Sequence, residues 1–186
     1  MNVIGIDEVG RGCWAGPLLI VAARAHRQLP EGLADSKLLS KQKRKSLIDG
    51  ITETCDLGEG WVQPEEIDAL GLASAMRLGV SRALIALNAK FDEAIIMDGT
   101  VNYCPDEFTN VETKAKADQT EPIVSAASVY AKVTRDAHMV RAAQFHPFYG
   151  FEKHVGYGTA IHQAALRVHG VSKIHRKSFK PVQAYA

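Results

Sequence analysis

The stretch Gly5-Ile6-Asp7-Glu8-Val9-Gly10-Arg11-Gly12 places two adjacent acids and a glycine-flanked arginine directly after an apolar run. Residues 2–6 predict a short buried strand, and residues 17–25 predict a second one. The glycines between the two runs favour a hairpin-like connection. Asp7 and Glu8 therefore stand where the first strand reaches the edge of its sheet.

A second apolar run, residues 94–97, also ends in an acid, Asp98, which is followed by Gly99. Acids at strand ends of an α/β sheet lie at the edge where binding sites form. Two such strands side by side would bring Asp7 and Asp98 within reach of one ion. The alternative is that each acid only closes a turn, because Asp before Gly is a common turn pair.

Two more acids follow, and each has a structural alternative to a functional role. Asp118 precedes a predicted helix, where an acid favours the helix dipole. Asp136 lies inside that helix, where it would pair with Arg135 or Lys132 on a solvated face.

Gathered carboxylates repel one another, and a cation relieves that repulsion. Oxygen ligands of this kind select Mg²⁺ or Mn²⁺ over zinc. Two such ions, roughly 3.5–4 Å apart, would clamp the attacking and leaving oxygens of a phosphodiester. The acids therefore suggest phosphoryl chemistry if the fold brings them together.

The remaining pattern predicts strands mixed with helices, hence a single α/β domain over residues 1–186. Ser36 or Ser40 is the expected N-cap of the first helix. A tail without a convincing period is expected from about residue 171. The other predicted elements are helices over 34–55, 64–91 (divided near Gly71), 120–145 and 159–170, and a strand over 59–63.

Composition excludes several classes of protein. The chain has 186 residues, of which 46% are hydrophobic and 23% charged, as in an ordinary globular domain. Its longest apolar run, near Leu18–Ala23, is far too short to span a membrane, and no signal peptide is evident at the start. The three cysteines form no CxxC pair, which indicates neither a disulfide framework nor a zinc site. We expect a cytoplasmic monomer.

The net charge of +1 is unevenly distributed. Residues 153–186 contain six Lys or Arg, four His, and no Asp or Glu. This segment is either a solvated basic tail or a surface that binds a polyanion.

Taken together, several segments resemble ribonuclease HII, and they occur in that family's order over almost the whole chain. The resemblance implies a ribonuclease H-like fold, with a mixed five-stranded sheet flanked by helices. The matching segments are GIDEVGRGCWAGPL at 5–18, DSKLLS at 35–40, MDG at 97–99, KADQTEPIVSAASVYAKVTRD at 116–136, GYGT at 156–159 and HRKSF at 175–179.

The resemblance also implies an endonuclease that uses two divalent ions, Mg²⁺ or Mn²⁺. The family's catalytic and metal-binding carboxylates would be Asp7, Glu8, Asp98 and Asp118, with Asp7 touching both ions. Asp136 matches a further acid near the site. The expected substrates are RNA/DNA hybrids and DNA duplexes with an embedded ribonucleotide, cut on its 5′ side to leave 5′-phosphate and 3′-hydroxyl ends. Two alternatives remain: a nucleic-acid-binding module without chemistry, and another nuclease of this fold.

The resemblance assigns substrate contacts to the two glycine-containing loops. The backbone around Gly10 and Gly12 would contact the ribonucleotide 2′-hydroxyl, which distinguishes RNA from DNA. Arg11 would hold a phosphate, and Tyr157 would stack on the next deoxyribose. Lys37 is expected near another phosphate. Val155 departs from the family pattern, in which many relatives have a small or basic residue before GYGT.

Overall fold

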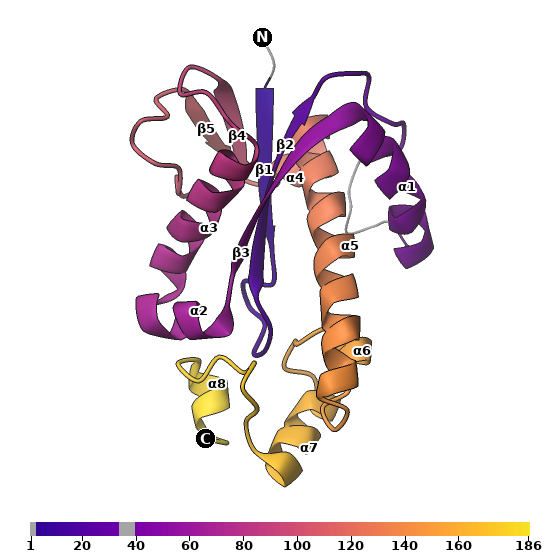
Figure 1. Ribbon diagram of the computed structural model, residues 1–186, viewed down its shortest axis with the longest axis vertical. Coiled ribbons are helices and arrows are strands. Elements are labelled where there is room, and N and C mark those ends of the chain that lie inside the picture. The colour runs from indigo at the N-terminus through magenta and orange to yellow at the C-terminus, as the bar shows by residue number, and fades with distance from the viewer. Residues whose placement is uncertain (1–2, 34–39) are drawn as a thin grey trace.

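The protein, described by a computed structural model over residues 3–33 and 40–186, contains a mixed five-stranded sheet in the order β3-β2-β1-β4-β5 (Figure 1). This confirms the fold class expected from the sequence. The strands are β1 Val3–Val9, β2 Leu18–Ala25, β3 Cys55–Val62, β4 Ala94–Asp98 and β5 Val111–Lys114.

The central strand β1 determines where the acids lie. It pairs antiparallel with β2, which confirms the expected hairpin, and parallel with β4. Ile6 is opposite Met97 in the parallel pair, so Asp7 and Asp98 follow at the same edge of the sheet. The two apolar runs therefore deliver their acids side by side.

Helices cover both faces of the sheet. Figure 1 shows α3 and α5 on opposite sides, and α6, α7 and α8 beyond the loop that joins β1 to β2. The first helix lies against α5. The helices are α1 Lys41–Thr54, α2 Pro64–Leu70, α3 Leu72–Ala86, α4 Ala117–Thr120, α5 Pro122–Phe145, α6 Phe151–His154, α7 Ala160–His169 and α8 Lys180–Gln183.

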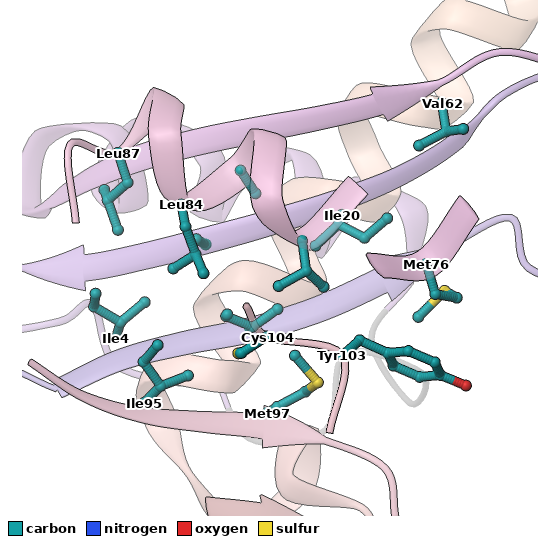
Figure 2. Packing of buried hydrophobic residues seen from close by; sticks show 14 of the residues in the cluster. Ile4, Ile20, Val62, Met76, Leu84, Leu87, Ile95, Met97, Tyr103 and Cys104 are labelled. Carbon is teal, nitrogen blue, oxygen red and sulfur yellow. The ribbon is translucent and has the colours of Figure 1, made fainter. Parts of the chain in front are cut away.

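The alternation of side chains along β1 supplies both faces of the core. Ile4 and Ile6 point to the α3 side, where they belong to one cluster of buried apolar side chains. Figure 2 shows Ile4, Ile95 and Met97 in this cluster. Each such side chain, when fully buried, contributes about 1.5–3 kcal/mol. On the opposite face, a Cβ at Gly5 would overlap the backbone of Ile123, so α5 lies unusually close to β1.

Several predicted element boundaries agree with the structure. The long helical segment is divided at Gly71 into α2 and α3, and Ser40 caps α1 by accepting a hydrogen bond from the Lys43 backbone N–H at 3.1 Å. Ser36, the other expected cap, lies outside the described residues.

Two strands were missed or shortened by the sequence prediction. The strand expected over 59–63 begins at Cys55, and its interior Gly58 and Gly60 weakened the signal. Both glycines are needed because a Cβ on either would overlap the backbone of α3. The edge strand β5 was missed because it is only four residues long and mostly polar.

The C-terminal segment differs most from its prediction. The tail expected from about residue 171 contains α8, and His175 forms a β-bridge with Ala15. Arg176 is fully buried, as is His162 in α7. Part of the basic segment is therefore interior, which limits how much of its charge is available to a polyanion.

No helix in the described part of the chain is long and apolar enough to cross a lipid bilayer.

Candidate active site

A cleft of about 460 Å³ opens where β1 and β4 end. Seven of the nine residues expected at the site line it, and three further side chains contribute from α1 and α5. The complete lining is Asp7, Glu8, Val9, Gly10, Arg11, Gly12, Arg44, Asp98, Ser128, Lys132 and Tyr157. The two glycine-containing loops thus share one cleft with three of the predicted carboxylates.

Asp7 is the most perturbed acid of the cleft. Its side chain is nearly buried, and burial raises its pKa to about 8, with the charges of Glu8 and Asp98 adding to the rise. Hydrogen bonds from Ser128 and from the Glu8 backbone N–H, the latter at 2.8 Å, oppose the shift without cancelling it. Ionised Asp7 is therefore unfavourable in this cleft unless positive charge is nearby.

Glu8 lies beside Asp7 and faces the glycine-flanked arginine. Arg11 Nη1 is 3.7 Å from Glu8 Oε1, and half of the Arg11 side chain is exposed. With its cation half-exposed and a long separation between the charged atoms, this ion pair contributes little to stability. The guanidinium is therefore available for a different anion at small cost.

Asp98 is held by the segment that carries Asp118. Its Oδ1 accepts a hydrogen bond from the Ala117 backbone N–H at 2.7 Å. Asp118, the next residue, is fully buried, and its backbone carbonyl accepts a hydrogen bond from the Ser125 hydroxyl. Asp118 is therefore adjacent in sequence to the residue that holds Asp98, but it is not among the residues that line the cleft.

The described residues contain no group of three or more acids, histidines or cysteines close enough to hold one metal ion. Asp7, Glu8 and Asp98 line one cleft, whereas Asp118 is buried and is not among its lining residues. The donor chemistry still suits a hard divalent cation, because oxygen ligands are the kind it prefers. A cation would also favour the ionised form of Asp7, which burial and, to a smaller extent, the charges of Glu8 and Asp98 disfavour.

The two glycines of the first loop have different surroundings. Gly10 has φ +88° and faces inward, where an added Cβ would overlap the Arg135 guanidinium. Around Gly12, nothing lies within 4 Å of an added Cβ. Gly10 is thus needed by the fold, whereas Gly12 is exposed and borders open space.

Tyr157 lines the same cleft as that loop. The residue is 40% exposed, and its ring centroid is 5.7 Å from Lys132 Nζ. Burial of the remainder raises the pKa of its hydroxyl, so the phenol stays neutral at ordinary pH. The exposed ring offers a flat apolar face to whatever enters the cleft.

The sequence prediction missed Ser128, Lys132 and Arg44. Ser128 and Lys132 are four residues apart in a helix that is otherwise rich in alanine, and this spacing puts both on one face. That polar stripe was the available signal. Asp136 continues it and accepts a hydrogen bond from Lys132 at 2.9 Å, as one of the two alternatives anticipated. Lys37 lies outside the described residues.

Comparison with known proteins agrees with this architecture. The family model described as Ribonuclease HII matches residues 4–182. Ribonuclease HII of Jannaschia sp. is 43% identical over 182 residues, covering 97% of this chain and 90% of the relative. Both chains are therefore alike over almost their full lengths.

Solved structures show the same fold. Ribonuclease H2 from Pyrococcus horikoshii has a TM-score of 0.76 at 26% identity, covering 100% of this chain and 97% of its own. The ribonuclease HII of a PCNA complex from Archaeoglobus fulgidus has a TM-score of 0.79 at 24% identity, covering 97% and 96%. Bst-RNase HIII in complex with Mn²⁺ has a TM-score of 0.74 at 22% identity, covering 100% and 69%.

The sheet order and the acid-lined cleft at its edge define a nuclease of the ribonuclease H-like fold. The chain belongs to the ribonuclease HII family. Membership supports cleavage of the RNA strand of RNA/DNA hybrids by this enzyme.

Proposed function

We propose that the enzyme also incises DNA duplexes on the 5′ side of a single embedded ribonucleotide, leaving 5′-phosphate and 3′-hydroxyl ends. The observation that carries this proposal is the shared cleft, in which the open side of Gly12 and the exposed ring of Tyr157 border the same space as Asp7. One cleft then has a place for a ribose, a place for the sugar that follows it, and acids at the bond between them.

The ribose is recognised by backbone rather than by a side chain. With no Cβ at Gly12, the loop backbone approaches the 2′-hydroxyl closely enough to hydrogen-bond it. The half-exposed Arg11 exchanges its partner Glu8 for a backbone phosphate, for which its planar fork is suited.

Tyr157 selects the deoxyribose that follows the cut site. Its exposed ring stacks on that sugar, where an additional 2′-hydroxyl fits poorly. Lys132, next to the ring, adds positive charge close to the passing phosphates. The expected contact of Lys37 with a phosphate remains a prediction.

Two divalent cations, Mg²⁺ or Mn²⁺, would supply charge neutralisation at the scissile phosphate and activation of the attacking water. Asp7, Glu8 and Asp98 would hold them at the cleft, and Asp118 is the proposed fourth ligand. The raised pKa of Asp7 and the Mn²⁺ complex of Bst-RNase HIII support a cation here. The chain acts on nucleic acid in this proposal, and we expect it to do so as a monomer.

The test is cleavage of three duplexes of one sequence: all-DNA, DNA with one ribonucleotide, and an RNA/DNA hybrid, each with Mg²⁺ or Mn²⁺. We expect one cut 5′ of the ribonucleotide, cleavage of the hybrid, and neither with Asp7→Asn. Cleavage of the hybrid alone would contradict recognition of the single ribonucleotide. Equal cutting of all-DNA duplex would overturn the proposal, and binding of all three without cutting would indicate a module without chemistry.

A further inference from the structure

Arg135 connects the two substrate loops from inside the protein. Its side chain is fully buried in α5, and its three nitrogens donate to three different backbone carbonyls. Nε bonds to Pro17 O at 2.8 Å, Nη2 to Ala15 O at 3.2 Å, and Nη1 to Val155 O at 2.9 Å. One guanidinium thus holds both the loop of residues 10–17 and the loop of residues 155–158.

The first loop is shaped around this guanidinium. An added Cβ at Gly10 would overlap Arg135 Nε, and one at Gly16 would overlap Met139 and lie 3.3 Å from Arg135 Nη2. Among the described residues, no carboxylate forms an ion pair with Arg135, and its neighbour Asp136 bonds instead to Lys132. Arg135 is therefore bonded to backbone carbonyls rather than to a carboxylate.

The second loop is held along its whole length. The Gly156 carbonyl accepts from the Trp14 N–H at 2.8 Å, Tyr157 from His162 Nδ1 at 2.9 Å, and Gly158 from Gln163 Nε2 at 3.0 Å. Val155, whose carbonyl is held by Arg135, has φ +45°, an unusual conformation for a β-branched residue. The ring of Tyr157 thus extends from a backbone whose position is fixed by donors on α5, α7 and the first loop.

We propose that Arg135 is a positioning residue that fixes the ribose-contacting loop relative to Tyr157 and thereby sets selectivity for a ribonucleotide followed by deoxyribonucleotides. This inference rests on the proposed function of the two loops. Lysine cannot replace Arg135, because a single ammonium on a flexible stem lacks the planar set of donors that reaches three carbonyls at once.

The test compares wild type with Arg135→Lys on the single-ribonucleotide duplex and on the RNA/DNA hybrid. The readout is the ratio of the two kcat/KM values, which a loss of folded protein alone does not change. We expect Arg135→Lys to lower this ratio at least 10-fold. Leu84→Ala, a core substitution on the other face of the sheet, is the matched destabilised control and should keep the wild-type ratio.

Tyr157→Ala provides a second comparison. If Arg135 acts through Tyr157, adding Arg135→Lys to Tyr157→Ala should lower the ratio no further. Additive losses, or a wild-type ratio in Arg135→Lys, would overturn the inference. A wild type that does not cut the single-ribonucleotide duplex would instead contradict the proposed function.

A measurement on protein that retains Arg135 covers the case in which Arg135→Lys does not fold. In Asp7→Asn bound to the single-ribonucleotide duplex, the Arg135 Nε–H should exchange with solvent at least 100-fold more slowly than that of Arg141, an exposed arginine of the same helix. Equal exchange rates would show that the bonds to the two loops do not persist on the substrate, which would overturn the inference.

Discussion

The Nε2 atoms of His162 and His175 lie 2.9 Å apart in the interior beside the cleft. The Ser172 N–H donates to His175 Nδ1, so the proton of that ring is on Nε2 and points to His162. His162 Nε2 is then the acceptor, and its Nδ1–H donates to the Tyr157 carbonyl. This chain of hydrogen bonds requires both rings to be neutral.

Acid should therefore weaken the fold through these two histidines. Burial lowers the pKa of His162 to about 4 and that of His175 to about 3. Because both lie below the usual 6.5, the unfolded chain binds protons first, and stability is lost as the pH falls from about 6.5 toward 4. We expect His162 alone to cost about 2 kcal/mol between pH 8 and pH 5, measured by urea unfolding.

His162→Asn is the informative variant, because an asparagine amide can still donate to the Tyr157 carbonyl but does not titrate. Its stability should change less between pH 8 and pH 5 than that of wild type. An unchanged slope in His162→Asn would show that this ring does not control the acid response.

Gly10 and Gly12 form a matched pair for separating folding from function. Gly10→Ala should lower the free energy of unfolding by about 1–3 kcal/mol, because φ is +88° and the methyl group would overlap Arg135. Gly12→Ala should change stability by less than about 0.5 kcal/mol, since nothing lies within 4 Å.

The activities of the same two variants complete the comparison. Gly12→Ala should cut a single-ribonucleotide duplex about 10-fold more slowly, because a displacement of only 1 Å at reacting groups can cost about 100-fold. Urea unfolding and initial rates on one preparation give both quantities. A Gly12→Ala variant with full activity would exclude close approach of the substrate at that position.

The sequence predicts those features of the fold and site that are marked by residues close together in the chain. Asp7 and Asp98 could be predicted because each follows an apolar run. The parallel pairing of the two runs then places both acids at the same edge of the sheet. Arg135 and Arg176 gave no such signal, because charged residues are normally exposed. Their partners are backbone carbonyls 118 and 160 residues away, at Pro17 and Gly16, and no side-chain pattern marks such an acceptor.

The histidines and the basic tail illustrate the same limit. The sequence showed that His162 and His175 lie in a segment free of acids, which suggested a charged surface. Only tertiary packing reveals that both are buried and neutral. Composition thus described the segment correctly but could not tell an interior base from an exposed one.

Asp7 should lower the stability of the folded protein at high pH, although cleavage requires it. Its raised pKa means that the folded protein keeps a proton that the unfolded chain releases, so Asp7 makes stability fall as the pH rises from about 4 toward 8. Asp7→Asn should therefore be more stable than wild type at pH 9 by more than about 1 kcal/mol, and nearly equal to it at pH 4. Its cleavage rate should fall by at least about 100-fold, the upper range for losing even an outer partner of a metal.

Added metal should offset the lower stability of wild type relative to Asp7→Asn at high pH. At pH 8, MgCl₂ or MnCl₂ should raise the melting temperature of wild type, because a cation bound at Asp7, Glu8 and Asp98 stabilises only the folded state. Asp7→Asn should respond much less. Potassium chloride at matched ionic strength is the control for screening, and an equal rise in both proteins would exclude Asp7 as a ligand.

Tyr157 should control which sugar follows the cut. Tyr157→Ala removes the exposed ring, and since stacking on an aromatic side chain is worth about 1–3 kcal/mol, preference for the ribonucleotide–deoxyribonucleotide junction over continuous RNA should fall roughly 10-fold. Tyr157→Phe keeps the ring and should keep the preference. The two rates are measured in one mixture of differently labelled duplexes, so enzyme concentration cancels. Loss of preference in Tyr157→Phe would instead assign the discrimination to the hydroxyl group, which lies beside Cys13.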